Sequence, residues 1–548
     1  MPVPASYNDI TENIETRDHI GYVWYETNFF ISKNWKNNRI FLRVGSATHS
    51  SIVWLNGKEI TKHTGGFLPF EVEITDDVNF GQNHRLTIAV DNRLTWNNLP
   101  PGEIKSYNDE NHPDGFKIQE YYFDFFNYSG LHRPVRLIAV PKTFIQDITA
   151  KTTIKKGFGI ITYKILTNER KPLNSQVRLL DKFGKEVLKT TGLLGDIKVQ
   201  KPNLWEWGNP YLYTLETKIF DDDNNLIDCY RLPIGIRTIK VTQNKFLLNG
   251  KPFYFKGFGK HEDSDIRGKG LDNAINVKDF NLLKWMGANS FRTSHYPYSE
   301  EIMNLADEEG FLIIDEVPAV GMNLWDHKKS VFNSNRVNQK TLNHHLQTIR
   351  ELIQRDKNHP SVVMWSVANE ATTYEKKALP YFKKVVEEVR KLDPTRPVTI
   401  VNSSSPDKCK VSHLFDVICI NRYFGWYTDT GHLELIEHQI GLELDKWFKN
   451  FKKPILVTEY GADTIAGIHK NPPSVFSEEF QIEFLNAYNR VFDKKKFVIG
   501  EHIWCFADFV TKQGINRVMG NKKGVFTRQR DPKSAAFIIR KRWNEEKV

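Results

Sequence analysis

From residue 238 to the C-terminus, short apolar runs alternate with amphipathic stretches, and this alternation leaves few possible folds. The apolar runs predict eight strands, at residues 253–258, 288–293, 311–315, 362–367, 398–401, 417–421, 454–458 and 498–503. The amphipathic stretches predict helices at residues 277–286, 300–309, 339–356, 375–392, 478–492 and 532–543. Eight strand–helix units in roughly 300 residues are typical of a (β/α)8 TIM barrel, whose functional side chains follow the carboxyl ends of the strands.

The part of the chain before the barrel has a different pattern. Short runs that alternate apolar and polar residues are separated by turn signals such as Asn56-Gly57. This pattern predicts two antiparallel β-sandwiches, and the second, of roughly 100 residues, has the size of an immunoglobulin-like sandwich. We therefore expect three domains, at residues 1–141, 142–238 and 239–548.

Composition excludes several classes of protein. The chain has no run of roughly 18 apolar residues, and its N-terminus lacks the pattern of a secretory signal. The net charge is +10, but the basic residues are dispersed and no nucleic-acid-binding motif is present. Four scattered cysteines predict neither a disulfide framework nor a metal site: Cys229, Cys409, Cys419 and Cys505. We expect a cytoplasmic protein that binds neither membranes nor nucleic acid.

Polar side chains gather where the predicted barrel strands end. Glu370 follows the fourth strand and Glu459 follows the seventh. One such glutamate could equally cap the next helix. Two glutamates in one barrel mouth favour glycoside hydrolysis, in which one carboxyl group is the acid and base and the other is the nucleophile. Further polar or aromatic residues at strand ends are His295, Asn369, Asn421, Tyr423 and Trp504.

Six segments resemble the β-glucuronidases of glycoside hydrolase family 2, of the bacterial type. They are residues 124–133 (DFFNYSGLHR), 291–297 (FRTSHYP), 358–370 (NHPSVVMWSVANE), 421–427 (NRYFGWY), 458–463 (TEYGAD) and 521–528 (NKKGVFTR). The resemblance covers nearly the whole chain and implies a jelly-roll sandwich, an immunoglobulin-like sandwich and a TIM barrel, in that order. Because the matching segment begins almost at Met1, the opening strands of the jelly roll are expected to be absent.

The resemblance also implies roles for the residues at the barrel mouth. Glu370 would be the general acid and base, and Glu459 the nucleophile. Asn369 would bind the 2-hydroxyl group of the sugar, a contact that strengthens in the transition state. Tyr423 would hold the nucleophile, and Asn421 would be a further substrate-binding residue.

The remaining implied contacts surround the sugar. Asp124, from the jelly roll, and His295 would bind hydroxyl groups, and Trp504 would form an apolar floor under the ring. The substrate carboxylate would lie near Tyr427, Arg517, Asn521 and Lys523. Without the resemblance, His295 and Trp504 would be interpreted as structural residues, and residues 517–523 as a solvated loop.

Together with the paired glutamates, the resemblance implies a retaining exo-β-glucuronidase that hydrolyses β-D-glucuronides to glucuronic acid and an alcohol through a covalent glycosyl-enzyme intermediate, with no metal or other cofactor. The resemblance suggests a homotetramer. Cys505 departs from the asparagine usual in the family. Two alternatives stay open: a β-galacturonidase or β-galactosidase of the same family, or a truncated, weakly active carbohydrate-binding protein.

Overall fold

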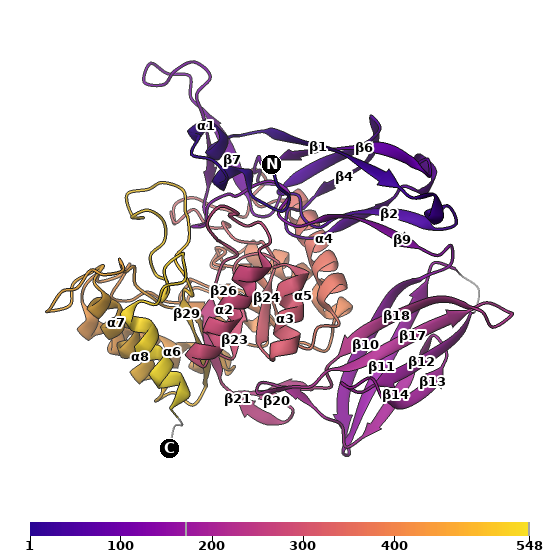
Figure 1. Cartoon of the computed structure of the whole chain (residues 1–548). Helices are drawn as coiled ribbons and strands as arrows, with labels where there is room; N and C mark the ends of the chain where they lie inside the picture. Colours follow the sequence, from indigo (N-terminus) through magenta and orange to yellow (C-terminus); the bar gives the residue numbers. More distant parts are fainter. Residues whose placement is uncertain (170–172, 546–548) are drawn as a thin grey trace.

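The computed structural model describes residues 1–169 and 173–545. Along the chain, a jelly-roll β-sandwich is followed by an immunoglobulin-like β-sandwich and a closed (β/α)8 barrel (Figure 1). This confirms the predicted fold class. The predicted domain limits stay a prediction, and the last three residues of the third domain lie outside the described residues.

The barrel is one closed sheet in which every neighbouring pair of strands is parallel. All eight positions of its fourth strand are buried, because helices cover the outside and side chains fill the inside. The strands are β22 (Phe255–Gly259), β23 (Ser290–Arg292), β24 (Leu312–Glu316), β25 (Val362–Asn369), β26 (Val398–Asn402), β27 (Ile418–Asn421), β28 (Ile455–Glu459) and β29 (Val498–Trp504).

The helices around the barrel bury one face each. They are α2 (Asn273–Met286), α3 (Glu300–Glu309), α4 (Gln339–Asp356), α5 (Ala378–Leu392), α6 (Ile436–Phe451), α7 (Glu478–Phe492) and α8 (Ser534–Asn544). Side chains that accept backbone N–H groups begin several of them, such as Asp272 at α2 and Ser299 at α3. The cap at Asp272 makes α2 start before the predicted residue 277.

Other predicted elements also differ from those in the structure. Helix α6 was not predicted; it begins without a side-chain cap and has Gly441 in its middle, both of which weaken the sequence signal. The first predicted barrel strand began two residues too early. A separate antiparallel sheet precedes the barrel and ends at Phe253: β19 (Ile239–Val241), β20 (Phe246–Leu248) and β21 (Lys251–Phe253).

The jelly roll consists of two antiparallel sheets and a hairpin. Ile40, Val53 and Ile88 contribute to the core between the sheets. One sheet consists, in spatial order, of β1 (Tyr22–Ile31), β6 (Gln82–Asp91), β3 (Ser50–Leu55) and β4 (Lys58–Thr64). The other consists of β5 (Phe70–Glu73), β2 (Arg39–Val44) and β9 (Val135–Val140). The short helix α1 (Ile14–Arg17) precedes them, and the hairpin is β7 (Gly102–Ser106) with β8 (Lys117–Tyr121).

The immunoglobulin-like sandwich is built the same way. Its core contains Ile161, Tyr163, Val177 and Leu215, which alternate with outward-facing residues. One sheet is β10 (Ile145–Lys155), β11 (Phe158–Thr167) and β14 (Leu194–Gln200); the other is β13 (Glu186–Thr191), β12 (Asn174–Leu180), β17 (Tyr213–Phe220) and β18 (Leu226–Ile234). A two-stranded ribbon, β15 (Trp205–Glu206) and β16 (Asn209–Pro210), follows the first sheet in the chain.

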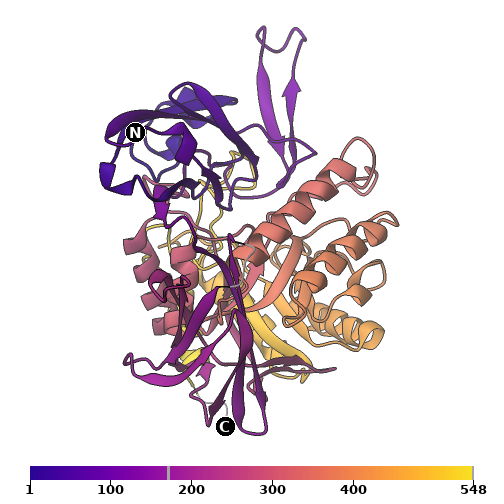
Figure 2. The same ribbon diagram turned by 90° about the vertical axis from the view of Figure 1, so that its right-hand side faces the viewer.

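The jelly roll lies over one end of the barrel (Figure 2). Arg133, which is buried, donates to the backbone carbonyl of Pro297 at 2.8 Å and lies 3.3 Å from the carboxylate of Glu262. Lys512, in the loop after β29, donates to the carbonyl of Tyr121 at 2.7 Å. The jelly roll is therefore attached directly to the loops that follow the barrel strands.

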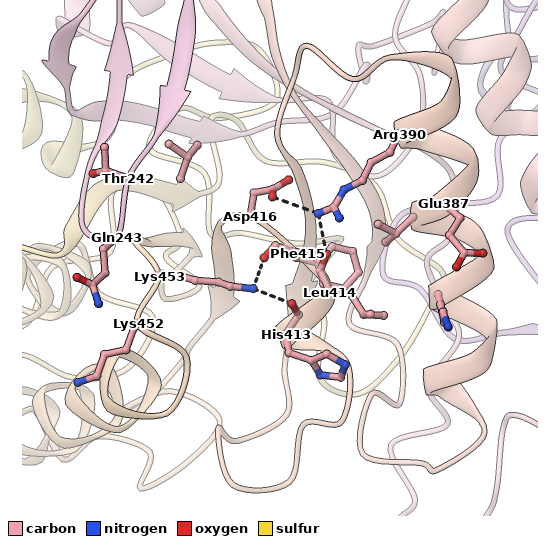
Figure 3. Close-up of a pocket in the computed structure, with 13 residues that line it drawn as sticks. Thr242, Gln243, Glu387, Arg390, His413, Leu414, Phe415, Asp416, Lys452 and Lys453 are labelled. Carbon is pink, nitrogen blue, oxygen red and sulfur yellow. Dashed lines mark hydrogen bonds and ion pairs between the residues drawn. The ribbon is translucent and has the colours of Figure 1, made fainter.

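A hollow of about 550 Å³ lies among the segments that precede β27 and β28, at the other end of the barrel. Two of its cations, Lys453 and Arg390, bind backbone carbonyls (Figure 3). Lys453 donates to the carbonyls of His413, at 2.9 Å, and Phe415. Arg390 donates to the carbonyl of Leu414 at 2.9 Å. We therefore assign a structural role to these side chains.

Lys453→Met should lower the free energy of unfolding by about 1–3 kcal/mol, because several carbonyl groups lose their donor. Thermal and denaturant unfolding measure this effect. Lys452→Met is the matched control, since Lys452 is exposed and its loss should change stability by less than about 0.5 kcal/mol. Equal losses of stability in the two variants would contradict the structural role of Lys453.

Candidate active site

A cavity of about 850 Å³ opens at the carboxyl ends of the barrel strands. Loops after the strands form most of its wall, and residues 121–124 of the jelly roll complete it. The cavity brings together all of the predicted site residues except Lys523. Those that line it are Asp124, His295, Asn369, Glu370, Asn421, Tyr423, Tyr427, Glu459, Trp504, Arg517 and Asn521.

The two predicted catalytic carboxylates sit on different strands. Glu459 is the last residue of β28, and Glu370 directly follows β25. Glu370 has a φ of 55°, in the left-handed region that residues other than glycine seldom adopt. Such backbone strain is concentrated at functional sites, where the surrounding structure holds it in place.

Glu459 is surrounded by groups that stabilise a carboxylate. Arg292 forms an ion pair with its Oε1, and Tyr423 donates its hydroxyl proton to Oε2 at 2.7 Å. Nε2 of His295 lies 3.7 Å from Oε1. The Glu459 side chain is buried, so these contacts replace the water that an exposed carboxylate would bind.

Glu370 has a different environment. Its Oε1 accepts a hydrogen bond from Nδ2 of Asn421 at 3.0 Å. Burial, followed by the negative charge of Glu459, raises the pKa of Glu370 to about 8. The two glutamates therefore differ at neutral pH: Glu370 holds a proton while Arg292 and Tyr423 bind Glu459 as an acceptor.

His295 and Trp504 form one wall of the cavity. Nδ1 of His295 lies 2.8 Å from Oε1 of Glu316, and its ring stacks on Trp504 at 5.0 Å between centroids. The thiol of Cys505 is buried and donates to the carbonyl of Ala507 at 3.2 Å. Burial raises the pKa of Cys505 well above its usual range, so this thiol is not poised to act as a nucleophile.

Charged groups from two domains meet at the cavity wall. Nε of Arg517 lies 2.8 Å from Oδ1 of Asp124, and Asn521 donates to Oδ2 of Asp124 at 2.7 Å. Nη2 of Arg517 donates to the hydroxyl oxygen of Tyr427 at 2.6 Å. Burial alone would raise the pKa of Asp124, but the charges of Arg517 and Lys523 outweigh it and lower that pKa.

Lys523 lies behind this wall rather than on it. Its ammonium group forms an ion pair with Asp463 and donates to the hydroxyl of Tyr427 at 3.0 Å. Only 1% of its side chain is exposed. Asp463 therefore compensates the charge of Lys523 without a bound substrate.

Sequence analysis missed three residues of the site. Arg292 and Glu316 are buried and form an ion pair at 2.8 Å, and Asp463 pairs with Lys523. Glu316 ends β24 and therefore carries the same strand-end signal that singled out Glu370 and Glu459. Arg292 and Asp463 lie within the segments that carry the family resemblance, but nothing in the sequence shows their partners.

Within residues 1–169 and 173–545, no three histidine, cysteine, aspartate or glutamate side chains are grouped as metal ligands would be. None of the helices in the described part of the chain combines the length and the apolar character needed to cross a bilayer.

All three domains match one family. Residues 4–141 match "Glycosyl hydrolases family 2, sugar binding domain", and residues 143–237 match "Glycosyl hydrolases family 2". Residues 239–548 match "Glycosyl hydrolases family 2, TIM barrel domain".

Similar proteins share the whole length of the chain. A protein named beta-glucuronidase from Paenibacillus borealis is 55% identical over 100% of this chain and 91% of its own length. The structure of beta-D-glucuronidase from Dictyoglomus thermophilum has a TM-score of 0.98 and 56% identity, and the match covers 100% of this chain and 93% of that one. The β-glucuronidase from Ruminococcus gnavus in complex with D-glucuronic acid has a TM-score of 0.93 and 44% identity, over 99% and 92% of the two chains.

Glu370 should titrate near pH 8 in the free protein, well above the ordinary value of 4.5 for a glutamate. Carbon-13 NMR of glutamate-labelled protein measures this, with Glu370→Gln to assign the signal. Asn421 donates to the carboxylate and so lowers the pKa of Glu370. Asn421→Ala should therefore move the midpoint to higher pH. A midpoint near 4.5, or one that falls in the variant, would contradict the environment described.

Proposed function

This chain belongs to family 2 of the glycosyl hydrolases, and on that basis we propose that it is a retaining exo-β-glucuronidase. It releases glucuronic acid from the non-reducing end of a β-D-glucuronide. One observation carries the proposal: the cavity at the barrel mouth holds both Glu370 and Glu459, and Arg517 and Asn521 line the same cavity. Similarity to the beta-glucuronidase of Paenibacillus borealis supports the same substrate class.

The reaction has two steps. In the first, Glu459 attacks the anomeric carbon while Glu370 gives its proton to the glycosidic oxygen, so that the alcohol leaves and a glycosyl ester forms. In the second, Glu370, now a carboxylate, takes a proton from water, and the water oxygen displaces Glu459 from the anomeric carbon. The surroundings of each glutamate support this assignment: within the described part of the chain, Glu459 forms an ion pair with Arg292 and Glu370 forms none.

The substrate contacts complete the proposal. We place the ring between Trp504 and the polar groups of Asp124, His295 and Asn369, which all line the cavity. Asn369 lies 3.2 Å from Nδ2 of Asn421 and so reaches the same region as Glu370.

We assign the carboxylate of the sugar to polar and cationic groups of the cavity wall and to Lys523 behind it. Tyr427, Arg517, Asn521 and Lys523 are the groups that would bind it, through charge-assisted hydrogen bonds that a neutral sugar cannot make. Turnover of paired glucuronide, galacturonide and galactoside substrates distinguishes this proposal from the other activities considered. Absence of turnover on all three would favour a carbohydrate-binding protein.

We extend the proposal to a cytoplasmic homotetramer. All four cysteines are free thiols, which suits a reducing compartment. The tetramer rests on the family resemblance alone, and sedimentation of the purified protein tests it.

Hydrolysis should proceed with net retention of configuration. We expect the carboxyl groups of Glu370 and Glu459 to be roughly 5 to 5.5 Å apart, which leaves no room for a water molecule to attack directly. Proton NMR of the first-formed sugar shows the outcome. The β anomer should appear first, and initial release of the α anomer would rule out the double-displacement mechanism.

Lys523→Ala should cost about 2–5 kcal/mol in kcat/KM for a glucuronide, in line with losing one partner of a buried charged pair. The corresponding glucoside lacks the carboxylate and should be affected little. Lys522→Ala is the control, because the Lys522 side chain is 25% exposed and lies 3.9 Å from Asp508. That variant should lose less than about 1 kcal/mol. Equal losses for the two variants, or for the two substrates, would show that Lys523 does not read the carboxylate.

A further inference from the structure

Lys523 places a positive charge in a buried position, with only 1% of its side chain exposed. Its Nζ lies 4.8 Å from the ring centroid of Tyr427 and 5.1 Å from that of Trp426. Contacts between a cation and aromatic faces offset only part of the free energy lost when an ammonium group leaves water. A buried lysine in such surroundings needs a counter-charge to stay protonated.

Asp463 supplies that counter-charge from the loop after β28. It is buried, and its Oδ2 forms the ion pair with Lys523. Its Oδ1 accepts the backbone N–H of Lys522 at 2.7 Å. Because its two oxygens bind adjacent residues of one loop, this carboxylate fixes the position of the Lys523 ammonium group as well as its charge.

The surrounding charges alternate in sign. Arg517 lies 3.5 Å from Asp463 and 2.8 Å from Asp124, so two carboxylates and two cations form one neutral cluster. An ammonium group has three N–H donors. Asp463 and Tyr427 account for two of those of Lys523, which leaves one for a ligand oxygen.

We propose that Asp463 is a positioning residue for uronate recognition: it holds the Lys523 ammonium group charged and in place to bind the carboxylate at C6 of the sugar. Asp463 does not line the cavity and contacts no reacting atom. This inference rests on the proposed function, and in it Asp463 contributes to selectivity for an anionic sugar through Lys523.

Asp463→Asn removes the negative charge of this side chain while keeping its size. The amide has the size of the carboxylate, but its oxygen can face either Lys523 or the N–H of Lys522, not both as acceptors. In the wild-type protein, burial lowers the pKa of Lys523, but Tyr427 and Asp463 raise it by more. In the variant the contribution of Asp463 is lost, so the pKa of Lys523 should fall. Lys523 of the variant should lose its proton as pH rises, and the neutral amine binds a uronate poorly.

The test compares kcat/KM for 4-nitrophenyl β-D-glucuronide and 4-nitrophenyl β-D-glucoside across the pH range. Ionisation of Glu370 affects both substrates and cancels in their ratio. The glucuronide-to-glucoside ratio of the wild type should stay constant with pH. In Asp463→Asn it should fall by roughly tenfold or more from the acidic to the alkaline end, the effect of losing a buried charged partner.

Asp508→Asn is the matched control. Asp508 is also a buried carboxylate bound to a lysine, with Nζ of Lys533 at 2.8 Å and the N–H of Gly524 at 3.0 Å. Its loss should lower the melting temperature but leave the substrate ratio equal to that of the wild type at every pH. A merely structural role for Asp463 predicts the same result for both variants.

A pH-independent ratio in Asp463→Asn, or one that changes equally in Asp508→Asn, overturns the proposal. If Asp463→Asn does not fold, Asp463→Glu serves instead: it keeps the charge but moves the ammonium group, so the ratio should fall equally at every pH. An unchanged ratio in Asp463→Glu would also overturn it. Failure of the proposed function shows separately, since the wild type would then not prefer the glucuronide.

Discussion

The guanidinium group of Arg292 is the interaction on which the site depends. It is fully buried and binds Glu459 on β28 and Glu316 on β24, so one cation joins three strands of the barrel. Burial alone would lower the pKa of Arg292, but the two carboxylates raise it, and the group stays charged. Arg292 is strongly held between these carboxylates, because its removal would leave two buried negative charges without their cation.

This arrangement allows the two neighbouring glutamates, Glu370 and Glu459, to take different chemical roles. Arg292 lets Glu459 carry a negative charge in a buried place, and that charge in turn favours the protonated form of Glu370. The difference between the two glutamates comes from the groups around them, since their side chains are chemically identical. The same logic recurs in the neutral cluster, where Asp463 and Asp124 keep Lys523 and Arg517 charged and in place.

Much of the fold could be predicted because strands of a parallel barrel are buried on both faces and appear as continuous apolar runs. The predicted ends of these strands fall within about two residues of those in the structure, and strand ends carry the polar groups of the site. Pairing between loops could not be predicted in this way. Asp463 and Lys523 are sixty residues apart and Asp124 and Arg517 almost four hundred, and no local pattern relates them. Glu316 was overlooked although it ends a strand, because no resemblance drew attention to it.

The contact between Asp124 and Arg517 has a consequence for how the protein matures. Residues 121–124 of the cavity wall belong to the jelly roll, which leaves the ribosome before the barrel that carries both glutamates, and domains generally fold in the order of their synthesis. The barrel therefore closes against a part of the wall that is already in place. A chain whose jelly roll has not folded would lack the carboxylate that pairs with Arg517, and with it part of the cavity wall.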